Sequence, residues 1–178
     1  MWKTLKRVAG ILFLLLVLII AIGALLPSRA HVERQITVAA PPARAFEVLN
    51  GFREFNKWSP WHERDPNTKY RYEGPEFGPG AKLAWESKHP QVGKGSQQIV
   101  TNEPDKRITV LLNFGAMGTA GASYTIVPEG AGSRITWAFD SEFGWDLFGR
   151  YMGLMMDRWI GPDYEKGLAN LKKLLEQH

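Results

Sequence analysis

The sequence predicts an α+β fold, in which a curved antiparallel sheet of about seven strands is covered by one long C-terminal helix and preceded by a single transmembrane helix. Three observations support this prediction. Residues 8–26 are apolar without interruption, the segments between residues 69 and 139 alternate polar and apolar side chains, and residues 146–177 carry apolar side chains at helical spacing. A sheet with one apolar face must be covered, and only the C-terminal helix is long enough to cover it.

The apolar run at 8–26 holds no charged side chain, and a helix of this length spans roughly 28 Å, close to the hydrocarbon thickness of a bilayer. Lys3, Lys6 and Arg7 precede it, and the first acidic residue is Glu33. This asymmetry predicts a cytoplasmic N-terminus and an exported C-terminal part at the cell (inner) membrane. The expected division is a basic cytoplasmic tip at 1–7, a signal anchor at 8–26, a linker at 27–30 and one domain at 31–178.

A cleaved secretory signal peptide is the competing interpretation of the same segment. Ser28, Arg29 and Ala30 place small residues at the spacing of a cleavage site. The apolar run is longer than the roughly 7 to 15 residues of a usual signal-peptide core, which favours an uncleaved anchor. Both interpretations place the domain outside the cytoplasm.

Composition excludes several functional classes. The chain has 22 Lys and Arg against 18 Asp and Glu, but four of the basic residues lie within the first 30, so residues 31–178 are formally neutral. A neutral domain gives no support to nucleic-acid binding. The chain contains no cysteine, which excludes disulfides, thiol catalysis and thiolate metal sites.

The first part of the domain is expected to form a strand at 31–38 and then two short helices. Pro41-Pro42 ends the strand and can begin a helix, because proline is tolerated in a first helical turn. Apolar residues at near-helical spacing follow from Ala45 to Phe52. The second short helix or turn carries three large aromatic side chains, Phe55, Trp58 and Trp61.

Beyond Pro66 the pattern changes to the two-residue period of half-buried antiparallel strands. Turn signals rich in glycine and proline separate the segments. The expected strands lie at 69–73, 82–87, 93–101, 107–114, 119–128 and 134–139. The C-terminal helix is expected from Asp146 to Gln177, with a kink at Gly161-Pro162.

Three motifs carry a resemblance to a known superfamily. They are Val38-Ala39-Ala40-Pro41-Pro42 with Phe46-Glu47-Val48-Leu49 after it, Trp58-Ser59-Pro60-Trp61, and Gly167-Leu168-Ala169-Asn170-Leu171-Lys172. Through them and the strand order, residues 31–178 resemble the SRPBCC superfamily of START-like or Bet v 1-like helix-grip proteins, and more closely its polyketide cyclase/dehydrase and lipid-transport-like branch. The resemblance implies a helix-grip fold that encloses a deep, mostly apolar cavity for a lipid, sterol, polyketide or other hydrophobic ligand.

Aromatic and methionine side chains are the strongest functional signal in the domain. Aromatic walls with flexible thioethers suit a pocket for bulky apolar ligands, and the alternative is that the same side chains form an ordinary core. Trp58 and Trp61 are expected to pack the short helices onto the sheet. The residues expected to line the cavity are Trp85, Phe114, Tyr124, Trp137, Phe139, Met152, Met155 and Trp159.

Catalytic and metal-binding signatures are sparse, so the sequence predicts no catalytic residue, metal or organic cofactor. His62-Glu63-Arg64-Asp65 lacks the second histidine, four residues on, that helical zinc-protease spacing requires. Glu86, Asp140 and Glu142 are expected on solvated strand positions. The small apolar connection at 115–121 is either a lid at the cavity mouth or an ordinary hairpin.

The leading functional hypothesis is a single-pass membrane protein whose exported domain binds a hydrophobic small molecule or lipid without catalysis. Its expected partners are the membrane and that ligand, not nucleic acid, and no protein partner is indicated. Two alternatives stay open. One is a cyclase- or dehydrase-like enzyme acting on a polyketide-like substrate, and the other is an envelope protein-interaction module.

Overall fold

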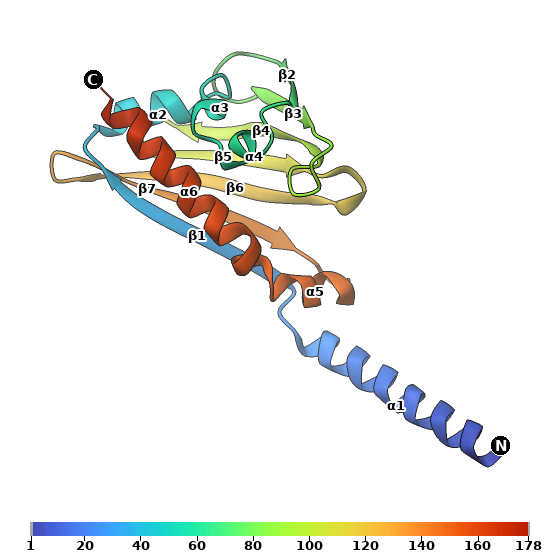
Figure 1. The fold of residues 1–178 in the computed structure, drawn as a ribbon. Helices are drawn as coiled ribbons and strands as arrows, with labels where there is room; N and C mark the ends of the chain where they lie inside the picture. Colours follow the sequence, from blue (N-terminus) through green and yellow to red (C-terminus); the bar gives the residue numbers. More distant parts are fainter. Residues whose placement is uncertain (1, 178) are drawn as a thin grey trace.

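An antiparallel sheet with the strand order β1-β7-β6-β5-β4-β3-β2 forms the body of the domain in the computed structural model, which describes residues 2–177 (Figure 1). Inward and outward side chains alternate as predicted: on β5, Ile108 and Val110 are buried, whereas Arg107 and Leu111 are exposed. The seven-stranded α+β prediction is confirmed within residues 2–177. The strands are β1 (Arg29–Val38), β2 (Lys69–Glu73), β3 (Lys82–Glu86), β4 (Lys94–Glu103), β5 (Arg107–Asn113), β6 (Thr119–Glu129) and β7 (Gly132–Glu142).

Three short helices, rather than the two expected, connect β1 to β2: α2 (Pro42–Leu49), α3 (Phe55–Trp58) and α4 (Pro60–Arg64). Pro60 explains the difference, because proline cannot continue a helix but fits the first position of the next one. The hydroxyl of Ser59 caps α4 by accepting a hydrogen bond from the backbone N–H of His62 at 3.4 Å.

The C-terminal segment forms two helices, α5 (Leu147–Gly153) and α6 (Met156–Glu176), so the prediction of one helix from Asp146 to Gln177 is wrong, and α6 continues through Gly161-Pro162. The break falls at Leu154-Met155 instead. Gly149 and Gly153 pack so closely on the Phe143 ring that a Cβ on them would lie 2.8 Å and 2.7 Å from it, and this contact fixes the direction of α5. Pro162 is tolerated inside α6 because it lies on the exposed side, where water can solvate the carbonyl group that it leaves unpaired.

The long helix α6 crosses the sheet and buries a stripe against it (Figure 1). The stripe consists of Tyr164, Leu168, Leu171 and Leu175, which the spacing of four, three and four residues places on one face. Tyr164 stacks on the indole of Trp137 on β7, with the ring centroids 3.8 Å apart. Gly167 allows this approach, because a Cβ at that position would lie 2.8 Å from the Trp137 ring.

Helix α1 (Trp2–Leu25) projects away from the domain, and its segment Thr4–Leu25 is long and apolar enough to cross a membrane (Figure 1). The domain forms hydrogen bonds with the C-terminal end of α1. The guanidinium of Arg150 donates to the carbonyl oxygens of Ala24 at 2.7 Å and Leu26 at 3.2 Å, and the Tyr151 hydroxyl donates to the carbonyl of Ile19 at 2.6 Å. Because β1 begins at Arg29, three residues connect α1 to the sheet.

Because Gly167 contacts Trp137, we expect the substitution Gly167→Ala to destabilise the fold, although helix propensity alone would favour alanine. Alanine normally stabilises a helix interior by about 1 kcal/mol over glycine. Because the added Cβ would meet Trp137 here, we expect Gly167→Ala to lower the free energy of unfolding by about 1–3 kcal/mol, measured by denaturant unfolding of the full chain in detergent. The control is Ala169→Gly at an exposed position of α6, where only helix propensity changes, and we expect it to lower the free energy of unfolding by about 1 kcal/mol. A stabilised Gly167→Ala variant would contradict the packing argument.

Candidate ligand-binding cavity

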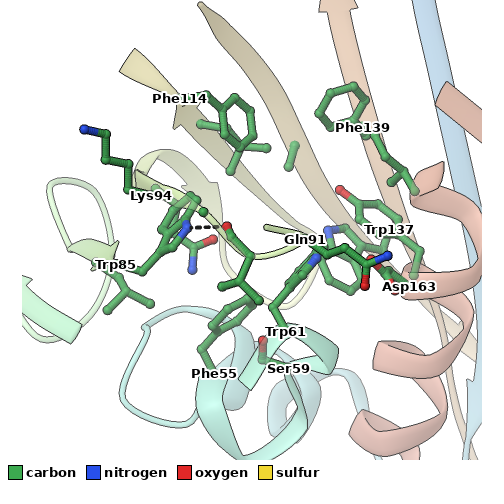
Figure 2. A pocket seen from close by; sticks show the side chains of 18 of the residues that line it. Phe55, Ser59, Trp61, Trp85, Gln91, Lys94, Phe114, Trp137, Phe139 and Asp163 are labelled. Atoms are coloured by element: carbon green, nitrogen blue, oxygen red, sulfur yellow. Dashed lines mark hydrogen bonds between the residues drawn. The ribbon is translucent and has the colours of Figure 1, made fainter. Parts of the chain in front are cut away.

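A cavity of about 360 Å³ lies between the inner face of the sheet, the short helices and α6 (Figure 2). Its position follows from the fold, because α6 packs along β1, whereas α3, α4 and the loop at 90–94 contribute side chains to the cavity wall. Most of the wall is aromatic or aliphatic. The apolar lining includes Phe55, Trp61, Leu83, Trp85, Leu112, Phe114, Ala122, Tyr124, Trp137, Phe139, Ile160 and Tyr164.

Five of the eight residues predicted to line a cavity do so: Trp85, Phe114, Tyr124, Trp137 and Phe139. All five lie on β3, β6 or β7 or directly after β5, where alternation sets which face a side chain occupies.

Met152, Met155 and Trp159 lie outside this lining, and the reason is the break between α5 and α6. The break leaves α5 beside the end of α1 instead of over the sheet, and Trp159 is half exposed on the first turns of α6.

Several lining residues were missed by sequence reasoning. Trp61 was expected to pack a short helix onto the sheet, but it contributes to the wall as well. Tyr164 lies on the same helical stripe as Leu168, and its spacing of four residues from Leu168 is the signal that could have identified it. Tyr70 and Ile160 also line the cavity, and no pattern in the sequence distinguished them from ordinary core residues.

Two phenol groups place polar atoms within this apolar space. Tyr124 and Tyr164 are almost completely buried, and both line the cavity. Burial raises the pKa of both phenols, because the phenolate would lose its hydration. The indole N–H of Trp137 is also buried without a partner in the described part of the chain. A wall with these groups offers hydrogen-bond donors to an otherwise apolar occupant.

Two charged residues contribute to the cavity wall: Asp163, which is paired with Arg64, and Lys94, which lies at the rim. Asp163 on α6 accepts two hydrogen bonds from Arg64 on α4, at 2.6 Å and 3.1 Å, and this carboxylate raises the pKa of Arg64. Glu86, Asp140 and Glu142 lie outside the lining. Within residues 2–177 there is no group of three or more His, Asp or Glu side chains that could hold a metal ion.

The cavity rim lies at the end of the sheet where α1 is attached. Residues 90–94, Phe114 and Met117 border the cavity there, and the Trp85 indole donates to the carbonyl of Val92 at 3.2 Å, which holds the loop in place (Figure 2). The strand register fixes the location: the pairs Glu86–Lys94, Asn113–Thr119, Gly121–Asp140 and Arg29–Glu142 all lie at this one end.

The connection at 115–121 is a hairpin with one 3-10 turn, η1 (Gly115–Met117). Met117 is 81% exposed and still borders the cavity, so the hairpin also forms part of the rim.

Comparison with known proteins identifies the domain. Residues 29–176 match the family described as polyketide cyclase / dehydrase and lipid transport. The chain belongs to this family. The match confirms the resemblance to the SRPBCC superfamily and to its polyketide cyclase/dehydrase branch.

Solved structures share the fold of this polyketide cyclase/dehydrase and lipid-transport family member. Norcoclaurine synthase from Thalictrum flavum, in complex with dopamine and hydroxybenzaldehyde, is 15% identical, with a TM-score of 0.63 over 84% of this chain and 88% of that chain. Protein CV1439 from Chromobacterium violaceum is 16% identical, with a TM-score of 0.56 over 83% and 98%. The Aha1 dimer from Colwellia psychrerythraea is 16% identical, with a TM-score of 0.54 over 83% and 96%. At these identities the likeness shows the fold alone. No curated protein matches the chain.

The buried phenols predict a loss of stability at high pH. Because the pKa of Tyr124 is raised in the folded chain, the unfolded chain releases that proton first, and the free energy of unfolding falls as the pH rises above about 10. We expect Tyr124→Phe to reduce this fall by up to about 1.4 kcal/mol per pH unit, measured by denaturant unfolding between roughly pH 9.5 and 11. Equal slopes in the two chains would mean that Tyr124 ionises in the folded state.

Proposed function

We propose that this protein is a membrane-anchored binding protein that holds a hydrophobic small molecule or lipid in its internal cavity, without catalysis. The single observation that supports this most strongly is the cavity itself: about 360 Å³, with walls that are mainly aromatic and aliphatic. Cavities of this size and chemistry are typical of small-molecule sites. The family description, which includes lipid transport, agrees with the same class of ligand.

The anchor is supported by the way the domain contacts α1. A cleavage site at Ser28-Arg29-Ala30 would fall within or directly before β1, where Arg29 pairs with Glu142 and Ala30 with Ser141. Cleavage would also remove the carbonyl groups that the buried guanidinium of Arg150 binds. Arg150 would then keep only the carbonyl of Gly144, so retention of α1 preserves the larger set of hydrogen bonds. We infer a cytoplasmic N-terminus and an exported domain at the inner membrane from the basic residues before α1.

The ligand should be mostly apolar and carry at least one hydrogen-bond acceptor. The phenols of Tyr124 and Tyr164 line the cavity and stay protonated at neutral pH, so each can donate a hydrogen bond to a carbonyl, ester or hydroxyl oxygen. Such a bond also compensates for the hydration that a buried phenol loses. Because the rim lies at the sheet end joined to α1, a lipid from the adjacent leaflet has a short path into the cavity.

A cyclase- or dehydrase-like reaction is the second candidate, favoured by the family description and by the same two phenols. A protonated phenol can act as an acid toward a carbonyl oxygen but not as a base at neutral pH. Asp163 supplies a carboxylate to the wall, but Arg64 holds both of its oxygens. Binding therefore fits the wall better than turnover. The preference would be reversed if the native chain released a dehydrated or cyclised form of its ligand and the Tyr124→Phe variant did not.

Two neighbouring leucines on β5 provide a matched test of binding. Leu112 lines the cavity, whereas Leu111 is exposed on the opposite face. We expect Leu112→Trp to fill the cavity and reduce the retained ligand by about tenfold or more, which corresponds to at least about 1.4 kcal/mol, while Leu111→Trp retains it. The measurement is mass spectrometry of small molecules extracted from the full chain after purification from membranes in mild detergent.

The outcomes of this experiment separate the alternatives. A native chain that repeatedly emerges empty, or a Leu112→Trp variant that retains as much ligand as Leu111→Trp, would contradict binding in this cavity. Circular dichroism of both variants checks that the added indole has not unfolded the domain.

A further inference from the structure

Exposed apolar side chains gather where the domain meets α1. We call Leu25, Trp145, Phe148 and Leu154 the junction face. Trp145 is 81% exposed, Phe148 is 72% exposed and Leu154 is 59% exposed. Three large apolar side chains with this exposure within ten residues are unusual on a water-facing surface and mark a contact site. These three side chains lie outside the cavity lining, so ligand binding in the cavity does not explain their exposure.

Buried hydrogen bonds hold the junction face against the end of α1. The guanidinium of Arg150 donates to the carbonyls of Ala24, Leu26 and Gly144, and so connects α1 to the turn that carries Trp145. The same guanidinium lies 5.0 Å from the centre of the Trp145 ring, within the range of a cation–π interaction. Freeing α5 from α1 would break the hydrogen bonds to Ala24 and Leu26 and leave the guanidinium only the carbonyl of Gly144, so the two helices are expected to move together.

The depth of these contacts along α1 identifies what covers the junction face. The Tyr151 hydroxyl reaches the carbonyl of Ile19, which lies about 9 Å along the helix axis before Leu25. Helix α5 therefore overlaps the last turns of α1 in depth. If α1 spans the bilayer, α5 lies at the level where the hydrocarbon meets the headgroups, and there tryptophan and phenylalanine are favoured.

We propose that the junction face docks into the membrane–water interface, with lipid as its occupant, and fixes the orientation of the domain on the bilayer. This inference rests on the membrane anchor of the proposed function and adds a second, peripheral contact to it. Docking of α5 also keeps the sheet end that carries Met117 and residues 90–94 directed toward the lipid surface.

The absence of cysteine from the chain allows a clean test with single-cysteine variants. Phe148→Cys places a label on the junction face, and Ala131→Cys places one in the exposed β6–β7 turn, at the opposite end of the sheet. Each full-length variant carries an environment-sensitive fluorophore and is reconstituted into phosphatidylcholine vesicles, with and without nitroxide-labelled lipid. Alkaline extraction of the same vesicles reports whether α1 is integrated.

Docking predicts a blue-shifted emission and several-fold stronger quenching by the nitroxide lipid at position 148 than at position 131. A water-like, unquenched signal at 148 in alkali-resistant protein would overturn docking and leave the anchor intact. A blue shift without nitroxide quenching would mean that protein, such as a second copy of the chain, covers the face, and it would overturn the lipid assignment. Release of the chain by alkali would overturn both the anchor and the docking.

Discussion

The seating of α6 on Trp137 is the constraint on which the rest of the domain depends. Gly167 and Tyr164 let the helix approach this indole, and Trp58 and Trp61 pack against its other sides. The aromatic cluster fills the space between α6 and β7, and Trp61, Trp137 and Tyr164 of this cluster also form one wall of the cavity. The cavity lies beside this cluster, where side chains from α3, α4 and the loop at 90–94 face the sheet.

Sequence patterns predicted the strands and their inward faces, because alternation is a local property and a one-residue shift would expose every apolar side chain. Trp85, Trp137 and Phe139 follow this alternation, and all three lie in the cavity lining. The helix break at Leu154-Met155 was not predicted, since it depends on how α5 packs against the Phe143 ring and against carbonyl groups of α1 more than 100 positions earlier in the chain. Met152, Met155 and Trp159 were assigned to the cavity on the assumption of one continuous helix.

The polar groups of the cavity distinguish it from an ordinary core. A core normally pairs its buried donors, yet the buried indole N–H of Trp137 has no partner within the described residues, and the phenols of Tyr124 and Tyr164 are buried at the cavity wall. Each such group costs free energy that a filled aliphatic core would not incur. A ligand with a well-placed acceptor recovers that cost, so affinity can come from groups that weaken the empty protein.

The distance along the chain between α1 and its buried partner sets an order of events during biosynthesis. Arg150 lies 126 residues after Ala24, and β1 pairs with β7, the last strand to be made. The helix is therefore synthesised, and would enter the bilayer, long before the guanidinium that fixes it to the domain exists. Until then it can rotate and tilt freely about the residues 26–28. Only completion of the fold converts a loosely tethered helix into one with a defined angle to the sheet, so that angle reports on whether folding has finished.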